Sequence, residues 1–96
     1  DLIPKSFSLY QNYPNPFNPI TNIGYDVPER TFVRIEIYDI TGRLIKVFNE
    51  GLQEPGHYIL NWNASDINGR RLSGGMYIYR INTENFSKTR KMILLK

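Results

Sequence analysis

The sequence has 96 residues, a net charge of +3 and no cysteine. Its length allows one small domain that buries roughly 65% of its unfolded surface, which leaves little volume for a deep catalytic cavity. The missing cysteines exclude disulfides, thiolate metal sites and cysteine nucleophiles, and the mild charge is far from the concentrated basic stripe of a nucleic-acid-binding protein.

Strand signals begin shortly after the N-terminus. The sequence opens on Asp1 rather than Met, so we expect a fragment of a longer protein, with residues 1–6 as a linker remnant and residues 7–96 as the domain. No apolar run reaches the roughly 18 residues of a membrane span. No signal peptide opens the given sequence, and any export signal is expected at the missing N-terminus. Residues 7–11 alternate apolar and polar side chains and predict the first strand.

A proline-rich segment follows, and its composition nearly determines its backbone. Pro14, Pro16 and Pro19 lock φ and remove three N–H donors, while each preceding residue is pushed into extended geometry. Residues 12–19 are therefore expected to form a stiff, irregular bridge, neither helix nor central strand, that crosses to the other sheet. We expect Tyr13 and Phe17 to pin this bridge to a core.

Alternating hydrophobicity predicts two strands after the bridge. The inward positions are Ile23, Tyr25 and Val27 in the first and Val33, Ile35 and Ile37 in the second. Pro28 ends the first strand because it cannot donate to a β-ladder. Residues 39–42 then turn the chain, with Gly42 supplying the positive φ of a short hairpin.

The return strand at residues 44–49 has an ambiguous apolar face, because its apolar residues fall on both sides. Leu44 and Phe48 compete with Ile45 and Val47. Residues 51–56 are expected to form a loop, after which Tyr58, Leu60 and Trp62 share one face of a fifth strand, with Trp62 as a core residue.

The last third of the sequence predicts a turn and two more strands. Asn68-Gly69 is a strong tight-turn dipeptide. Tyr77, Tyr79 and Ile81 share a face in residues 76–83, and residues 87–96 form the last strand. With no helical periodicity and about seven strands, the pattern predicts an all-β, immunoglobulin-like antiparallel β-sandwich.

The order of these motifs resembles the C-terminal sorting domain of the bacterial type IX secretion system, a family related to the C-terminal domain of the flagellar hook-capping protein. The resemblance covers residues 7–96. The matching positions are Asn12, Tyr13, Pro14, Asn15, Pro16, Phe17, Gly42, Trp62, Gly69, Gly75 and Tyr77, together with the terminal strand from Lys91 to Lys96. The hook-capping relative shares the hairpin and residues 61–77, and the asparagine-proline bridge favours the sorting family.

This resemblance implies a non-catalytic sorting signal of a secreted or cell-surface protein. Its partners would be the type IX secretion machinery at the outer membrane and an upstream passenger domain in the same chain, reached through the periplasm. A recognition signal here would use a surface rather than a pocket. We expect Lys88, Arg90, Lys91 and Lys96 to present charge to a receptor, although lysines also protect sheet edges.

The sequence lacks the residues for an active site, and no catalytic residue, cofactor or metal ligand is predicted. His57 is the single histidine and is expected in a structural role, and no serine lies in a nucleophile elbow. Residues 66–69 resemble the start of a calcium loop without its later ligands, so a self-bonded turn at Asp66 is the simpler interpretation.

Carbohydrate binding, or a structural role in a secreted multidomain enzyme, is the alternative function. Exposed tyrosines would form a flat stacking surface for sugars in that case. The candidates are Tyr10, Tyr13, Tyr38 and Tyr79.

Overall fold

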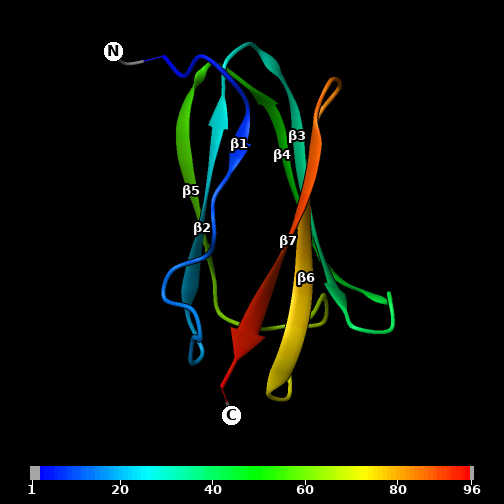
Figure 1. Ribbon diagram of the computed structural model, residues 1–96. Helices are drawn as coiled ribbons and strands as arrows, with labels where there is room; N and C mark the ends of the chain where they lie inside the picture. Colours follow the sequence, from blue (N-terminus) through cyan, green and yellow to red (C-terminus); the bar gives the residue numbers. More distant parts are fainter. Residues whose placement is uncertain (1–2, 96) are drawn as a thin grey trace.

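The fold is a sandwich of two antiparallel sheets, seen in a computed structural model that describes residues 3–95 (Figure 1). The seven strands are β1 (Ser8–Leu9), β2 (Thr21–Val27), β3 (Thr31–Asp39), β4 (Leu44–Gln53), β5 (Gly56–Trp62), β6 (Gly75–Asn82) and β7 (Ser87–Leu94). One sheet has the order β1-β2-β5 and the other the order β4-β3-β6-β7. The predicted all-β sandwich of about seven strands is confirmed.

The core lies between the sheets and is built from the alternating positions that the sequence predicts. The inward residues of β2, β3 and β6 are all buried: Ile23, Tyr25, Val27, Val33, Ile35, Ile37, Tyr77, Tyr79 and Ile81. Trp62 ends β5 and is also buried. Because successive side chains of a strand point to opposite faces, one face of each sheet supplies the core and the other meets solvent.

The ambiguous face of β4 is explained by two irregularities in its pairing with β3. The register shifts between Ile37 and Tyr38, where Ile45 has no direct partner, and Ile45 is buried. A bulge of this kind inserts one residue and reverses the alternation beyond it. A second shift adjoins Gly51, whose φ is 73°. β4 therefore runs to Gln53, and the loop expected at residues 51–56 is only two residues long.

The proline segment joins the two sheets, but only one of its aromatic residues enters the core. Tyr13 pairs with Asn22 of β2, and Phe17 pairs with Leu94 of β7 in the opposite sheet. Phe17 is buried as predicted, whereas the expectation for Tyr13 was wrong, since its side chain is 78% exposed. The Tyr13 backbone exchanges two hydrogen bonds with Asn22, which holds the segment while the ring projects outward.

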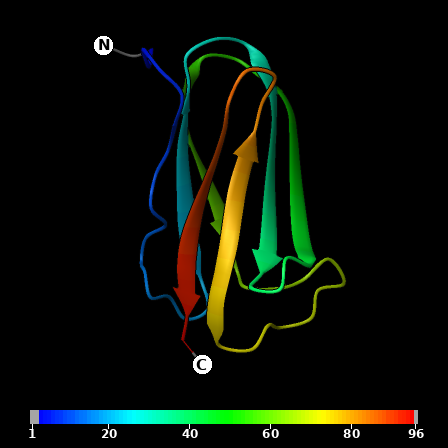
Figure 2. The same cartoon turned by 45° about the vertical axis from the view of Figure 1, so that its right-hand side comes forward.

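The described chain enters at one end of the sandwich, and β7 finishes at the other (Figure 2). The molecule measures 38 × 22 × 20 Å, so the two ends are separated by its longest dimension. The first and last strands are both shorter than expected. β1 covers only Ser8–Leu9 and β7 covers Ser87–Leu94, and Lys96 lies outside the described residues.

Candidate functional site

The C-terminal strand β7 is an edge strand of the four-stranded sheet, and only one of its faces contributes to the core. Met92 and Leu94 are buried, whereas Lys91, Ile93 and Leu95 are exposed. β7 pairs with β6 along its whole length. Cross-strand partners point to the same side of a sheet, so the register of β7 gives the direction of each basic side chain.

The structure does not bring the predicted basic residues onto one face. Lys88 and Arg90 lie opposite Ile81 and Tyr79, on the inner side of the sheet, whereas Lys91 lies opposite Ile78 on the outer side. Arg90 is half-buried and its Nε donates to the carbonyl of Leu9 in β1. Among residues 3–95, no carboxylate forms an ion pair with Lys88, Arg90 or Lys91, and Lys96 lies outside that range.

The proline segment and the adjoining Gln11 cover the C-terminal half of the free edge of β7. The Phe17 amide donates to the Ile93 carbonyl at 3.0 Å, and the Leu95 amide donates to the Phe17 carbonyl at 2.8 Å. The Ile93 amide donates to Oδ1 of Asn15 at 3.0 Å, and Nε2 of Gln11 donates to the Lys91 carbonyl at 2.7 Å. An edge strand otherwise exposes unpaired backbone groups, so this segment limits where another chain can pair with β7.

Three of the aromatic motif residues, far apart in sequence, meet in one cluster at the C-terminal end of the core. The Trp62 ring lies 5.9 Å from that of Phe17 and 6.5 Å from that of Tyr77. Nε1 of Trp62 donates to the Ser65 carbonyl at 3.0 Å, so its polar atom is satisfied although the ring is buried. These residues support the fold and do not form an exposed site.

Asn12 is a buried polar anchor of the proline segment. Its side-chain Nδ2 donates to Oγ1 of Thr21 at 3.0 Å. Its backbone N–H donates to the hydroxyl of Tyr79 at 2.8 Å. The Tyr79 hydroxyl donates in turn to the carbonyl of Tyr10. Burial of the Tyr79 ring raises its pKa. The motif positions at the start of the bridge therefore fix its path across the end of the sandwich.

Two aspartates organise the turns at this same end. Oδ1 of Asp39 accepts from the hydroxyl and amide of Thr41 and from the Arg43 amide, and Oδ1 of Asp66 accepts from the Asn68 and Arg70 amides. These hydrogen bonds lower the pKa of both carboxyls. As predicted, Gly42 supplies a positive φ of 89°, and Gly69 in the predicted tight turn has a φ of 78°. Between the turns lies a hollow of about 510 Å³, and the charged residues that line it are Asp39, Arg43, Asp66, Arg70 and Arg71.

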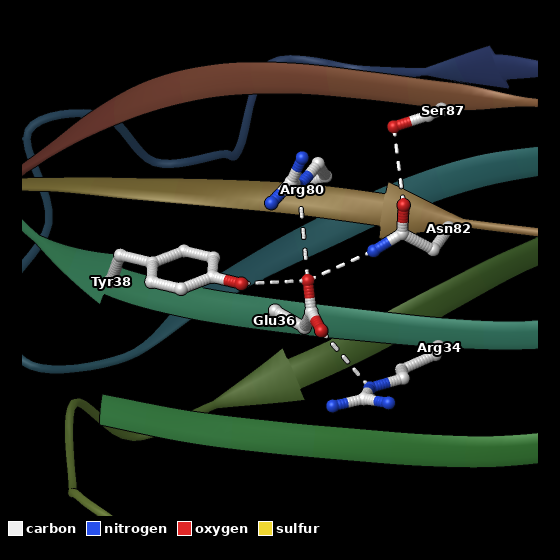
Figure 3. Close-up of polar contacts among 6 residues, drawn as sticks. All are labelled: Arg34, Glu36, Tyr38, Arg80, Asn82 and Ser87. Carbon is white, nitrogen blue, oxygen red and sulfur yellow. Dashed lines mark hydrogen bonds and ion pairs between the residues drawn. The ribbon is translucent and has the colours of Figure 1, made fainter. Parts of the chain in front are cut away.

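The outer face of the four-stranded sheet carries a buried carboxylate that sequence reasoning missed. Oε1 of Glu36 accepts from the Tyr38 hydroxyl and from Nδ2 of Asn82, each at 2.8 Å (Figure 3). Nε of Arg34 lies 3.0 Å from Oε2, and Nε of Arg80 lies 3.7 Å from Oε1. Alternation alone places Glu36 on a solvent-facing side, so no local signal marks its burial by neighbouring strands.

The outer face of the three-stranded sheet holds His57 in the structural role that was expected. Its Nδ1 lies 2.6 Å from Oδ1 of the buried Asp26, whose other oxygen accepts from the Tyr10 hydroxyl. The hydrogen bond from the Tyr10 hydroxyl to Asp26 raises the pKa of that hydroxyl. Residues from β2, β5 and the chain beyond β1 are thereby tied together across the sheet.

The tyrosines considered for sugar stacking do not share a surface. Tyr79 is fully buried, while Tyr38 lies on the outer face of the four-stranded sheet. Tyr10 covers Gly24 on the opposite sheet, and Tyr13 projects from the proline segment. The flat platform expected for carbohydrate binding is therefore not formed by these residues.

Residues 3–95 contain no group of three or more His, Asp or Glu side chains placed to hold a metal ion. No helix in this part of the chain has the length and hydropathy needed to cross a membrane.

Several proteins of known structure share this fold. No functionally curated protein matches the sequence. Dimeric latent PorU from Porphyromonas gingivalis matches with a TM-score of 0.76 and 21% identity, covering 91% of this chain and 9% of PorU. PorZ, an essential surface component of the type IX secretion system of Porphyromonas gingivalis, matches with a TM-score of 0.65 and 24% identity, covering 93% of this chain and 12% of PorZ.

FlgD from Pseudomonas aeruginosa also has this fold, with a TM-score of 0.62 and 23% identity over 77% of this chain and 57% of FlgD. The chain thus spans about a tenth of PorU and PorZ. The family described as secretion system C-terminal sorting domain matches residues 11–95, nearly the whole sequence. The chain therefore belongs to the secretion system C-terminal sorting domain family.

Proposed function

We propose that this domain is a non-catalytic signal that directs an upstream passenger protein across the bacterial outer membrane through the type IX secretion system. The family match over residues 11–95 carries the proposal. The passenger reaches the periplasm first, and the secretion machinery then recognises the folded domain. Residues 7–96 act as the signal and residues 1–6 as the remnant of the linker to the passenger.

The geometry suits recognition along the exposed strand β7, which runs from the end where the chain enters to the end away from the passenger. An upstream domain joins where the described chain enters, while β7 finishes at the opposite end (Figure 1). Lys88 and Lys91 are exposed and have no carboxylate partner among residues 3–95. Their charges are therefore available to a receptor. Lys96, which lies outside the described residues, remains part of the proposed signal. Arg90 has a second, structural role through its hydrogen bond to Leu9.

The test is export of a fluorescent reporter that carries a Sec signal and this domain, in a bacterium with type IX secretion. We expect the intact domain to place the reporter outside the cell. Reversing the charges of both lysines, Lys88→Glu with Lys91→Glu, is expected to retain the reporter in the periplasm, because the receptor loses its electrostatic contact. A folded wild-type domain whose reporter stays in the periplasm would refute the proposed function.

A matched control reverses two charges that lie outside β7. Lys5 is exposed, and Arg30 forms only a surface ion pair with Glu54. Exposed pairs of this kind contribute roughly 0–1 kcal/mol, so Lys5→Glu with Arg30→Glu should fold normally. We expect this variant to be exported like the wild type. If it is retained, export depends on net charge and not on β7.

A further inference from the structure

We propose that the outer face of the four-stranded sheet is a docking surface for an acidic, partly apolar protein segment. The inference rests on the proposed function, because it assigns this segment to the secretion machinery. We define the outer face by the outward side chains of β3, β6 and β7 together with Leu44 of β4. No element of the described chain covers this face (Figure 2).

The register of the sheet places exposed apolar side chains on this face, with Phe32 beside Leu52 at one end and a larger group spanning four strands in the half nearest the C-terminal end. Leu44, Tyr38, Ile78 and Lys91 lie side by side across the four strands. The next row holds Met76 opposite Ile93. Leu44, Met76 and Ile93 are each between 42% and 44% exposed. Clustered exposed apolar groups on a small soluble domain mark an interaction site more often than scattered single ones do.

The net charge beside this apolar patch is positive. Arg34, Arg80 and Lys91 are the cations at the outward positions of β3, β6 and β7, and Glu36 is the one carboxylate at those positions. Glu36 is buried and already accepts four contacts (Figure 3). A partner therefore meets net positive charge, and carboxylates on that partner complement it.

Glu36 also gives the face a fixed shape. It holds Arg34 on one side and Arg80 on the other, and the Arg80 guanidinium lies 5.8 Å from the centre of the Tyr38 ring. Both arginines keep about half of their side-chain surface exposed, 52% and 43%. Preorganised arginine side chains lose less conformational entropy on binding and can engage carboxylates with two parallel hydrogen bonds.

The test places opposite charges at one position beside the arginines. Thr89 is exposed and lies opposite Arg80 on the outer face. In the reporter assay, we expect Thr89→Glu to lower export about tenfold and Thr89→Lys to maintain it, because only the carboxylate repels an acidic partner. Met76→Glu is expected to lower export as well. The control is Ile59→Glu on the opposite sheet, where Ile59 is 77% exposed.

Each outcome decides the inference. Export of wild type and Thr89→Glu at the same level overturns it and leaves the proposed function standing, whereas retention of the wild type refutes the proposed function itself. Loss of export in Thr89→Lys or Ile59→Glu, in variants that melt cooperatively, also overturns it, because the effect would then not follow charge or face. Binding of the purified domain to phosphatidylglycerol vesicles, abolished by Thr89→Glu, would replace the protein partner by a membrane.

Discussion

At the residue scale, the two turn aspartates make the stability of the domain depend on pH. Their hydrogen bonds lower the folded-state pKa of Asp39, chiefly through Thr41, and of Asp66, chiefly through the Arg70 amide, below the ordinary value of 3.8. A carboxyl whose pKa is lower in the folded state contributes stability that is present above its unfolded pKa. That contribution is lost as the pH falls through the folded-state pKa. We therefore expect these turns to weaken in acid, below the ordinary aspartate pKa.

The Asp66→Asn variant tests this expectation, because its amide oxygen can still accept hydrogen bonds but does not titrate. Between about pH 5 and about pH 2, its melting temperature should fall less than that of the wild type. Glu84→Gln serves as the control, since Glu84 is an exposed carboxylate in the β6–β7 turn. Equal falls for Asp66→Asn and the wild type would contradict the role given to Asp66.

At the element scale, the side chain of Asn15 adds one hydrogen bond to the backbone contacts through which the proline segment holds the C-terminal strand. Asn15→Ala removes the acceptor of the Ile93 amide. We expect a loss of about 1 kcal/mol, which lowers the melting temperature by roughly 4–8 °C in a domain of this size. Amide exchange at Ile93 should accelerate about fivefold, while the buried Ile81 of β6 stays protected.

Asn18 provides the matched control for this element. It also precedes a proline, yet its side chain makes no hydrogen bond to another described residue. Asn18→Ala should therefore leave the exchange at Ile93 unchanged. If both variants accelerate exchange equally, the effect does not come from the hydrogen bond between Asn15 and Ile93.

Sequence reasoning succeeded where local alternation decides the structure and failed where distant strands decide it. β2, β3, β5 and β6 alternate regularly, and their inward residues are the ones predicted. The bulges of β4 depend on pairing with β3, and the burial of Glu36 depends on β6. For the candidate site, the basic residues of β7 were predicted by position. Their division between two faces follows from the β6 register, which the sequence alone does not show.

At the scale of the whole molecule, the C-terminal strand belongs to the folded core as well as to the candidate signal. β7 contributes the buried Met92 and Leu94, pairs with β6, and receives the proline segment at its edge. Burying two such side chains supplies roughly 3–6 kcal/mol, against a total stability of about 5–15 kcal/mol for a typical domain. Removing β7 would also expose the edge of β6. Deleting β7 would therefore disrupt the fold as well as remove the candidate sorting signal.

A chain that ends at Asn85 is accordingly expected to lose cooperative folding. Thermal melting followed by near-ultraviolet circular dichroism should show no sharp transition, because Trp62 and Tyr77 lose their packed surroundings. Met92→Leu in the full chain is the control, since a volume-conserving change costs less than about 1.5 kcal/mol and should retain the transition. A cooperative transition in the shortened chain would contradict this account and make truncation a clean test of sorting. If the transition is absent, failed export of the shortened chain reflects unfolding, and only folded charge variants can locate the signal.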